Sequence, residues 1–190
     1  MVLSVRLRVS GAVLVALALA VVATIPLTAQ VRQINLREMV GSAGVAFVGT
    51  VVETHGGLDD DGEIVTWTTF RVEQPIGFVP VQLVTVKQLG GTANGLSHFL
   101  SHMRYFTLGE RVLVMFYPTS TLGFTSPIGL DQGVWSVSTD GRVLGVRQSA
   151  LEGMGPELAR HGITPRPAQD IELARFTTLL EELFRGRDVR

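Results

Sequence analysis

Cysteine is absent from this chain of 190 residues, and lysine occurs once. Without cysteine the protein has no thiol nucleophile, no disulfide and no cysteine-based zinc or iron–sulfur site. Its stability must therefore come from an apolar core, and 46% of its residues are hydrophobic. The length suits a single domain with a core of its own.

Charge is also scarce, since charged residues make up 17% of the chain and the formal net charge is −1. Residues 1–29 contain two of the 16 basic residues and none of the 17 acidic ones, so the remainder has a net charge of −3. A mildly acidic chain lacks the basic surface that binds a phosphate backbone. Nucleic acid is therefore not an expected partner.

The N-terminal segment is basic and then apolar. Arg6 and Arg8 precede residues 9–31, which contain no charged residue. This layout is typical of a Sec export signal, and Ala29 fits the position before the cut. We expect residues 1–29 to be a signal peptide and the mature protein to be periplasmic or extracellular. The alternative is an uncleaved anchor, because the apolar run also reaches the ~20 residues that span a bilayer. In that case residues 9–29 would be the only membrane contact.

The mature chain predicts a short helix followed by strands. Asn35 is a good N-cap for a helix within residues 35–44. Gly49 predicts a bulge or a sharp bend, and the apolar run of residues 110–117 predicts a strand buried on both faces. The pair Asp140–Gly141 predicts a tight hairpin turn. Alternating or β-branched runs predict six strands over residues 45–55, 63–75, 81–89, 110–117, 133–139 and 143–148, with the glycine-rich 90–95 as a loop.

Five or six such strands predict a mainly β fold, namely a small OB-like barrel, closed or partly closed, over residues 30–147. Residues 148–168 have few periodic apolar positions and predict a linker. Residues 169–186 have a helical period, with Asp170 as N-cap and Gly186 as the end. The apolar stripe of this helix predicts packing on the barrel or, alternatively, docking on another protein. The stripe consists of Leu173, Phe176, Leu180 and Leu183.

Several of these pieces together resemble a known family. In order they are VAFVGTVVE, TWTTFRVEQPIG, VTVKQLGG, FTLGERVLVMFY and GLDQGVWSV. This series is similar to uncharacterised secreted bacterial proteins that resemble the OB-fold, netrin-like domain of tissue inhibitors of metalloproteinases. The resemblance covers about Leu36 to Val146 and the last helix. It implies the fold and a secreted or membrane protease as partner. Those inhibitors place an N-terminal cysteine on the protease zinc, so no residue of this chain inherits that role.

Two sequence patterns are candidates for metal-binding sites. His98 and His102 would share one face of a helix, as in zincins, but Phe99 stands where zincins carry their glutamate base. A zinc site also needs a third or fourth ligand, and the spacing of His55 and His161 brings neither close. We interpret the segment as a polar loop and keep a metal site at His98 and His102 as the alternative. The run DDDGE at 59–63 lacks the glycine and glutamate spacing of a calcium loop and predicts a polar turn.

Trp67 and Trp135 are the aromatic candidates for ligand binding. A tryptophan in such a strand usually packs in the core, but OB-type barrels also use aromatic platforms for sugars. No serine stands in a G-x-S-x-G motif. The leading hypothesis is therefore an exported, non-enzymatic module that binds a protein and needs no cofactor. The alternatives are a metal-dependent hydrolase using His98 and His102, and an envelope protein that binds a saccharide across Trp67 and Trp135.

Overall fold

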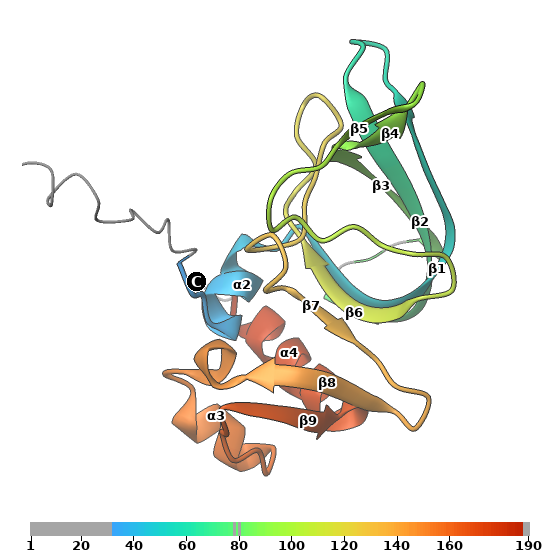
Figure 1. Cartoon of the computed structure of the whole chain (residues 1–190). Helices are drawn as coiled ribbons and strands as arrows, with labels where there is room; N and C mark the ends of the chain where they lie inside the picture. Colours follow the sequence, from blue (N-terminus) through green and yellow to red (C-terminus); the bar gives the residue numbers. More distant parts are fainter. Residues whose placement is uncertain (1–31, 78, 80, 188–190) are drawn as a thin grey trace, which may run out of the picture. The chain divides into compact units, whose positions relative to one another are not determined.

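Five antiparallel strands form the central sheet of the computed structural model, which describes residues 32–77, 79 and 81–187. The strand order is β3-β2-β1-β6-β7 (Figure 1). The prediction of a mainly β fold is confirmed. The predicted signal peptide or anchor at residues 1–29 lies outside the described residues. The strands are β1 (Val45–Leu58), β2 (Ile64–Ile76), β3 (Leu83–Leu89), β6 (Arg111–Phe116) and β7 (Val134–Ser136).

Two local features of the sheet follow the sequence closely. The pairing of β1 with β2 shifts register between Val48 and Gly49, which is the predicted bulge. A Cβ at Gly49 would lie 2.7 Å from the carbonyl oxygen of Arg71, so the strands approach closely there. The predicted burial of β6 on both faces is also confirmed, since every residue from Val112 to Phe116 is buried.

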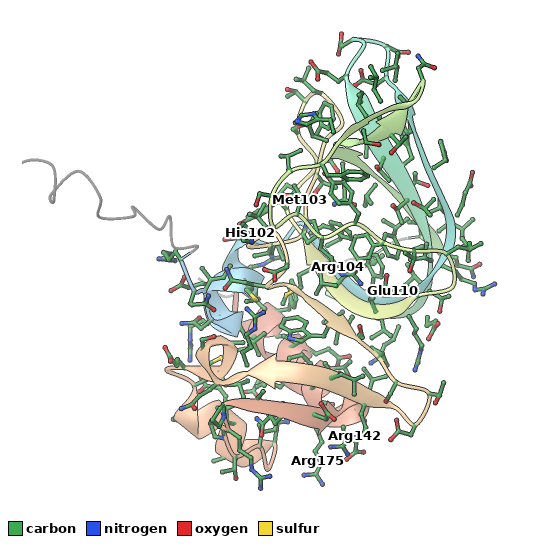
Figure 2. All side chains as sticks on the ribbon, viewed as in Figure 1. His102, Met103, Arg104, Glu110, Arg142 and Arg175 are labelled. Carbon is green, nitrogen blue, oxygen red and sulfur yellow. The ribbon has the colours of Figure 1, made fainter. Side chains whose placement is uncertain are left out.

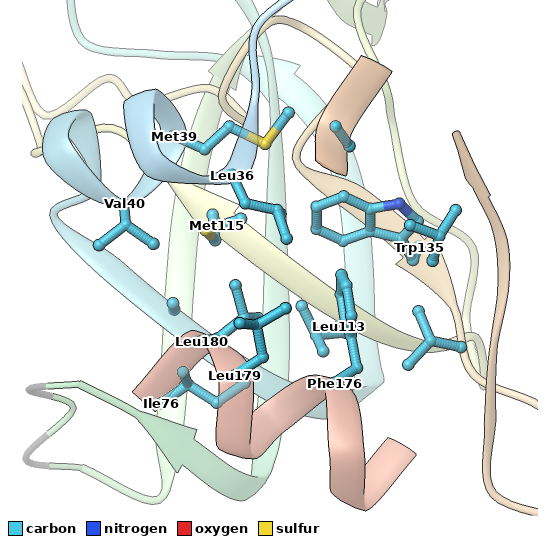
Figure 3. Packing of buried hydrophobic residues seen from close by; sticks show 14 of the residues in the cluster. Leu36, Met39, Val40, Ile76, Leu113, Met115, Trp135, Phe176, Leu179 and Leu180 are labelled. Carbon is cyan, nitrogen blue, oxygen red and sulfur yellow. The ribbon is translucent and has the colours of Figure 1, made fainter. Parts of the chain in front are cut away.

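The two faces of the sheet bury different sets of side chains. One face builds a phenylalanine core, in which the rings of Phe47 and Phe70 lie 5.4 Å apart and those of Phe70 and Phe106 4.9 Å apart. The opposite face packs against α2, α4 and residues 148–171, forming a helix-side core (Figure 3). The phenylalanine core is Phe47, Val51, Phe70, Val86, Phe106, Val112, Val114 and Phe116.

The first helix of the described residues lies where the sequence predicts it. Helix α2 (Leu36–Ser42) is capped by Asn35, whose side-chain oxygen accepts a hydrogen bond from the Glu38 N–H at 3.0 Å. Its buried face consists of Leu36, Met39 and Val40. This face joins the helix-side core, so the helix covers part of the sheet.

The predicted loop at residues 90–95 is wrong. It contains most of a small hairpin, β4 (Gly91–Ala93) paired with β5 (Leu96–His98). Asn94 and Gly95 form the turn, both with positive φ (51° and 77°), as the type I′ hairpin turn requires. Strands of three residues are too short to show a period of two, so the sequence pattern gave no sign of them.

The C-terminal third of the chain differs most from the prediction. Strand β8 (Arg142–Arg147) does not extend the central sheet but pairs with β9 (Ala168–Glu172). The predicted tight turn before β8 is present, because the Gly141 N–H donates to the Ser138 carbonyl at 3.1 Å. One isolated bridge, Val137 to Val143, connects β8 to the chain after β7.

The predicted linker at residues 148–168 is ordered structure instead. It contains η1 (Gln148–Leu151) and α3 (Gly155–Arg160) and leads into β9. Its apolar residues are too irregularly spaced to show a helical period, yet they enter the helix-side core. The buried residues of this segment are Ala150, Leu151, Met154, Leu158 and Ile163.

The last helix begins later than predicted. Helix α4 spans Leu173–Arg187, so Asp170 is not its N-cap and Gly186 lies inside it. Asp170 belongs to β9, where its side chain accepts a hydrogen bond from the Gly145 N–H at 2.9 Å. The helix buries Phe176 and Leu180 against the sheet, as its apolar stripe predicted, while Leu173 and Leu183 are partly buried at the margin.

The described strands do not form a continuous closed barrel. Residues 124–127 lie between the edge of β3 and the end of β6. The Thr125 N–H donates to the Lys87 carbonyl at 3.0 Å, and the Tyr117 N–H donates to the Ser126 carbonyl at 3.0 Å. Within the described part of the chain, no helix has the length and apolar character needed to cross a membrane.

Candidate functional site

The segment HFLSH is not a helix, so its two histidines do not share a helical face. His98 is the last residue of β5, and His102 has a positive φ of 63° in a turn. His102 lies in the irregular segment before β6, which also carries Arg104 and Glu110 (Figure 2). Nowhere in the described residues do three His, Asp or Glu side chains group as metal ligands would. His98 and His102 thus gain no third ligand here.

The other two histidines have partners elsewhere. The His55 ring stacks on Trp67, with centroids 5.2 Å apart and planes 21° apart. The His161 Nε2 atom lies 2.7 Å from Glu182, which also pairs with Arg160. The hydrogen bond from Arg160, followed by that from His161, lowers the pKa of Glu182. This charge cluster ties α3 to α4, which is a structural role.

The acidic run at residues 59–63 is a turn organised by Asp59. One oxygen of Asp59 accepts hydrogen bonds from the N–H groups of Asp61 and Glu63, at 3.1 and 2.9 Å. The other oxygen pairs with the Lys87 ammonium at 2.9 Å. The hydrogen bond from Lys87 is the main cause that lowers the pKa of Asp59. Lys87 also lies over the Phe124 ring, 4.0 Å from its centroid.

The two tryptophans lie in different surroundings. Trp67 is half-buried on β2 beneath His55. Trp135 is 6% exposed in the helix-side core, where its ring meets Phe176 edge-on at 5.3 Å. The two indoles share no ring partner among the described residues, and the structure does not bring them together into one platform. Trp135 also lines a pocket beside β7 and β8.

An exposed apolar group gathers at the end of the sheet where β1 turns into β2. Strand β4 crosses β1 closely there, since a Cβ at Gly56 would lie 2.4 Å from the Thr92 carbonyl oxygen. Figure 1 shows the β1–β2 turn and the β4–β5 hairpin at this same end. The link from Asp59 through Lys87 to Phe124 brings the loop of residues 118–125 to it as well. We name this surface the loop end: Leu58, Leu96, Phe99 and Leu122 with the carboxylates of Asp60, Asp61 and Glu63.

The loop end combines apolar side chains with uncompensated negative charge. Its four large apolar residues are between 48% and 67% exposed. None of its three carboxylates has an ion-pair partner among the described residues, in contrast to Asp59. The sequence gave no sign of this surface, because its members come from three segments that are far apart along the chain.

A pocket of about 250 Å³ lies between α2, β7 and β8. Its apolar side includes Met39, Leu144 and Trp135, and its polar side includes Arg147 and Asp131. The sequence singled out Trp135 alone, since the other lining residues come from a predicted helix, predicted strands and loops that only the fold brings together. Comparison of the chain with protein-family models, with curated proteins and with solved structures gives no match.

Proposed function

We propose that this protein is an exported, non-enzymatic module that binds a protein partner through its loop end. The observation that carries this proposal is that four large apolar side chains, 48–67% exposed, come from segments that meet at one end of the sheet. Exposed apolar residues scattered singly are ordinary, but a contiguous group indicates an interaction surface. The sequence of residues 1–29 supports export.

The frame beneath the loop end supports binding with little reorganisation. The Asp59–Lys87 pair joins the β1–β2 turn to β3, and Lys87 in turn contacts Phe124. The Phe99 ring is held edge-on against Tyr105, with centroids 5.0 Å apart. Side chains that are already positioned lose less conformational entropy on binding.

The chemistry of the loop end defines the partner. Apolar side chains flanked by Asp60, Asp61 and Glu63 favour a protein segment with both apolar and basic residues. The resemblance to the netrin-like inhibitors suggests a secreted or membrane protease as the class of partner. The inhibitory cysteine of that family is missing, so binding here would rest on the loops.

We also propose that the sheet forms an OB-like, partly closed barrel. Residues 124–127 hydrogen-bond to β3 on one side and to β6 on the other, which would close the sheet around the phenylalanine core. In a partly closed barrel of this kind the loops gather at the ends, and OB folds use such loops, together with a strand face, to bind ligands.

Site-specific photo-crosslinking in the native envelope tests the proposal. A photoreactive amino acid is placed at Phe99, at Leu122 or at Leu83, and the adducts are identified by mass spectrometry. Leu83 is the matched control, because it is 58% exposed but opens β3 at the strand end away from β4.

We expect Phe99 and Leu122 to trap the same protein and Leu83 to trap none. Recovery of uncrosslinked protein alone from both loop-end positions would contradict the proposal. An equal yield of the adduct from Leu83 would also contradict it, since the contact would not then be specific to the loop end.

A further inference from the structure

The pocket beside Trp135 has the features of a second binding site, separate from the loop end. It is lined from α2, from the loop before β7 and from β7, β8 and η1. Its volume of about 250 Å³ lies just below the range of drug-sized ligand sites, about 300–1,000 Å³. A ligand of this pocket is therefore a small molecule or a single side chain.

Trp135 lines this pocket, and its indole N–H is an unused donor. Trp135 is 6% exposed, yet its N–H makes no hydrogen bond to any described residue. The nitrogen is not sealed in the core either, because the fully buried unpartnered side-chain atoms among the described residues belong to Gln88, Glu157 and Gln169. A buried tryptophan N–H usually finds an acceptor. In this pocket a ligand can supply one.

The charges around the pocket favour an anion. Arg104 and Arg147 line it together with one carboxylate, Asp131. Arg104 is already engaged, since it pairs with Glu110 and donates to the Tyr105 carbonyl at 2.5 Å. Arg147 lies 3.8 Å from Asp131, which is longer than a hydrogen bond, and its side chain is 59% exposed. The Arg147 guanidinium therefore keeps donors for a ligand.

We propose that this pocket binds a small monocarboxylate with an apolar body. The carboxylate accepts hydrogen bonds from the Trp135 N–H and from Arg147. The apolar body lies against Met39 and Leu144. Charge-assisted hydrogen bonds are about twice as strong as neutral ones, so the acid is preferred over a neutral analogue of the same shape.

Two-dimensional NMR of ¹⁵N-labelled protein observes the signal of the Trp135 indole N–H directly. The chain has two tryptophans, and the Trp67→Phe variant assigns the remaining indole N–H signal to Trp135. The probes are phenylacetate, its neutral amide phenylacetamide, and methyl glucoside as a saccharide. We expect phenylacetate to move the Trp135 signal downfield with a Kd on the order of 1 mM, as suits about ten heavy atoms. Phenylacetamide should bind at least about fivefold more weakly, and methyl glucoside should leave the signal in place.

Two arginine variants distinguish binding at this pocket from a general effect of the protein's positive charge on an anion. Arg147→Gln should weaken phenylacetate binding about fivefold and leave phenylacetamide binding unchanged. Arg166→Gln, an exposed arginine outside this pocket, should change neither. The proposal is overturned if phenylacetate leaves the Trp135 signal in place, if acid and amide bind equally, if methyl glucoside shifts the signal as phenylacetate does, or if Arg166→Gln weakens binding as much as Arg147→Gln.

Discussion

The single lysine of the chain has a structural position. Lys87 is on β3, and its ammonium reaches both the Asp59 carboxylate and the face of the Phe124 ring. The side chain of Asp59 is only 4% exposed. A carboxylate charge that is shielded from water in this way needs a positively charged partner. One residue thus connects the β1–β2 turn, β3 and the loop of residues 118–125.

Replacing Asp59 by asparagine should destabilise the protein in a pH-dependent way. The hydrogen bond from Lys87 lowers the pKa of Asp59 below its ordinary 3.8, so the ionised form is favoured in the folded state. The resulting stability is fully present above pH 3.8 and is lost as the pH falls through the folded-state pKa. In urea unfolding, Asp59→Asn should therefore have a lower midpoint than the wild type at pH 7, and the difference should shrink toward pH 2.

The control for this measurement is Asp61→Asn. The side chain of Asp61 is exposed and makes no ion pair with a described residue. Its replacement should leave the midpoint at pH 7 unchanged. A difference between Asp59→Asn and wild type that stays constant from pH 7 to pH 2 would show that the Lys87 pair does not carry the effect.

At the scale of single residues, the sequence predicted local backbone features better than it predicted which side chains contact one another. It indicated the cap at Asn35 and the bulge at Gly49, because both depend on local backbone geometry. It identified Trp135 as a candidate but could not place Arg147 in the same pocket, because that pocket is formed between β7 and β8. The pairing of Asp59 with Lys87, 28 positions apart, likewise requires the three-dimensional fold.

At the scale of elements, residues 148–168 contribute to the core and do not merely connect two parts. Leu158 is 2% exposed, and its carbonyl accepts a hydrogen bond from the Ile163 N–H at 2.9 Å. Helix α3 also carries Glu157, which pairs with Arg37 of α2 at 2.7 Å. The segment therefore joins the two helices that cover the sheet.

Leu158→Ala should lower the free energy of unfolding by about 2–5 kcal/mol, as is usual for a buried leucine. Glu152→Ala, an exposed position in the same segment, should stay within about 0.5 kcal/mol of wild type. Urea unfolding followed by circular dichroism measures both. Equal stability of the two variants would mean that the segment behaves as the linker that its sequence suggested.

The elements that were predicted correctly are those with long, regular patterns. Strands β1, β2 and β6 have continuous β-branched or alternating runs, and α4 has a clear apolar stripe. The elements that were missed are β4, β5, η1, α3 and β9, which have three to six residues each. Such short elements depend on tertiary contacts, so their own residues show no period.

At the scale of the molecule, the sheet separates two cores with different compositions. Phenylalanine rings dominate one, while helices α2 and α4 and residues 148–171 complete the other. The proposed protein-binding surface and the proposed ligand pocket lie on different elements. The loop end belongs to the β1–β2 turn, the β4–β5 hairpin and the loop of residues 118–125, whereas the pocket is lined mainly by α2, β7, β8 and η1, with Arg104 and Asp131 from loops.

The central claim is that the apolar side chains of the loop end bind the partner. The most direct measurement is the yield of the adduct from a photoreactive residue at Phe99 in cells that express a Leu96→Ser, Leu122→Ser double variant. Both leucines are at least 65% exposed, so the substitutions should leave the unfolding midpoint close to that of wild type. We expect the adduct to be lost in the double variant and retained in a Leu83→Ser control. Retention of the adduct in the double variant, with the fold intact, would contradict the claim.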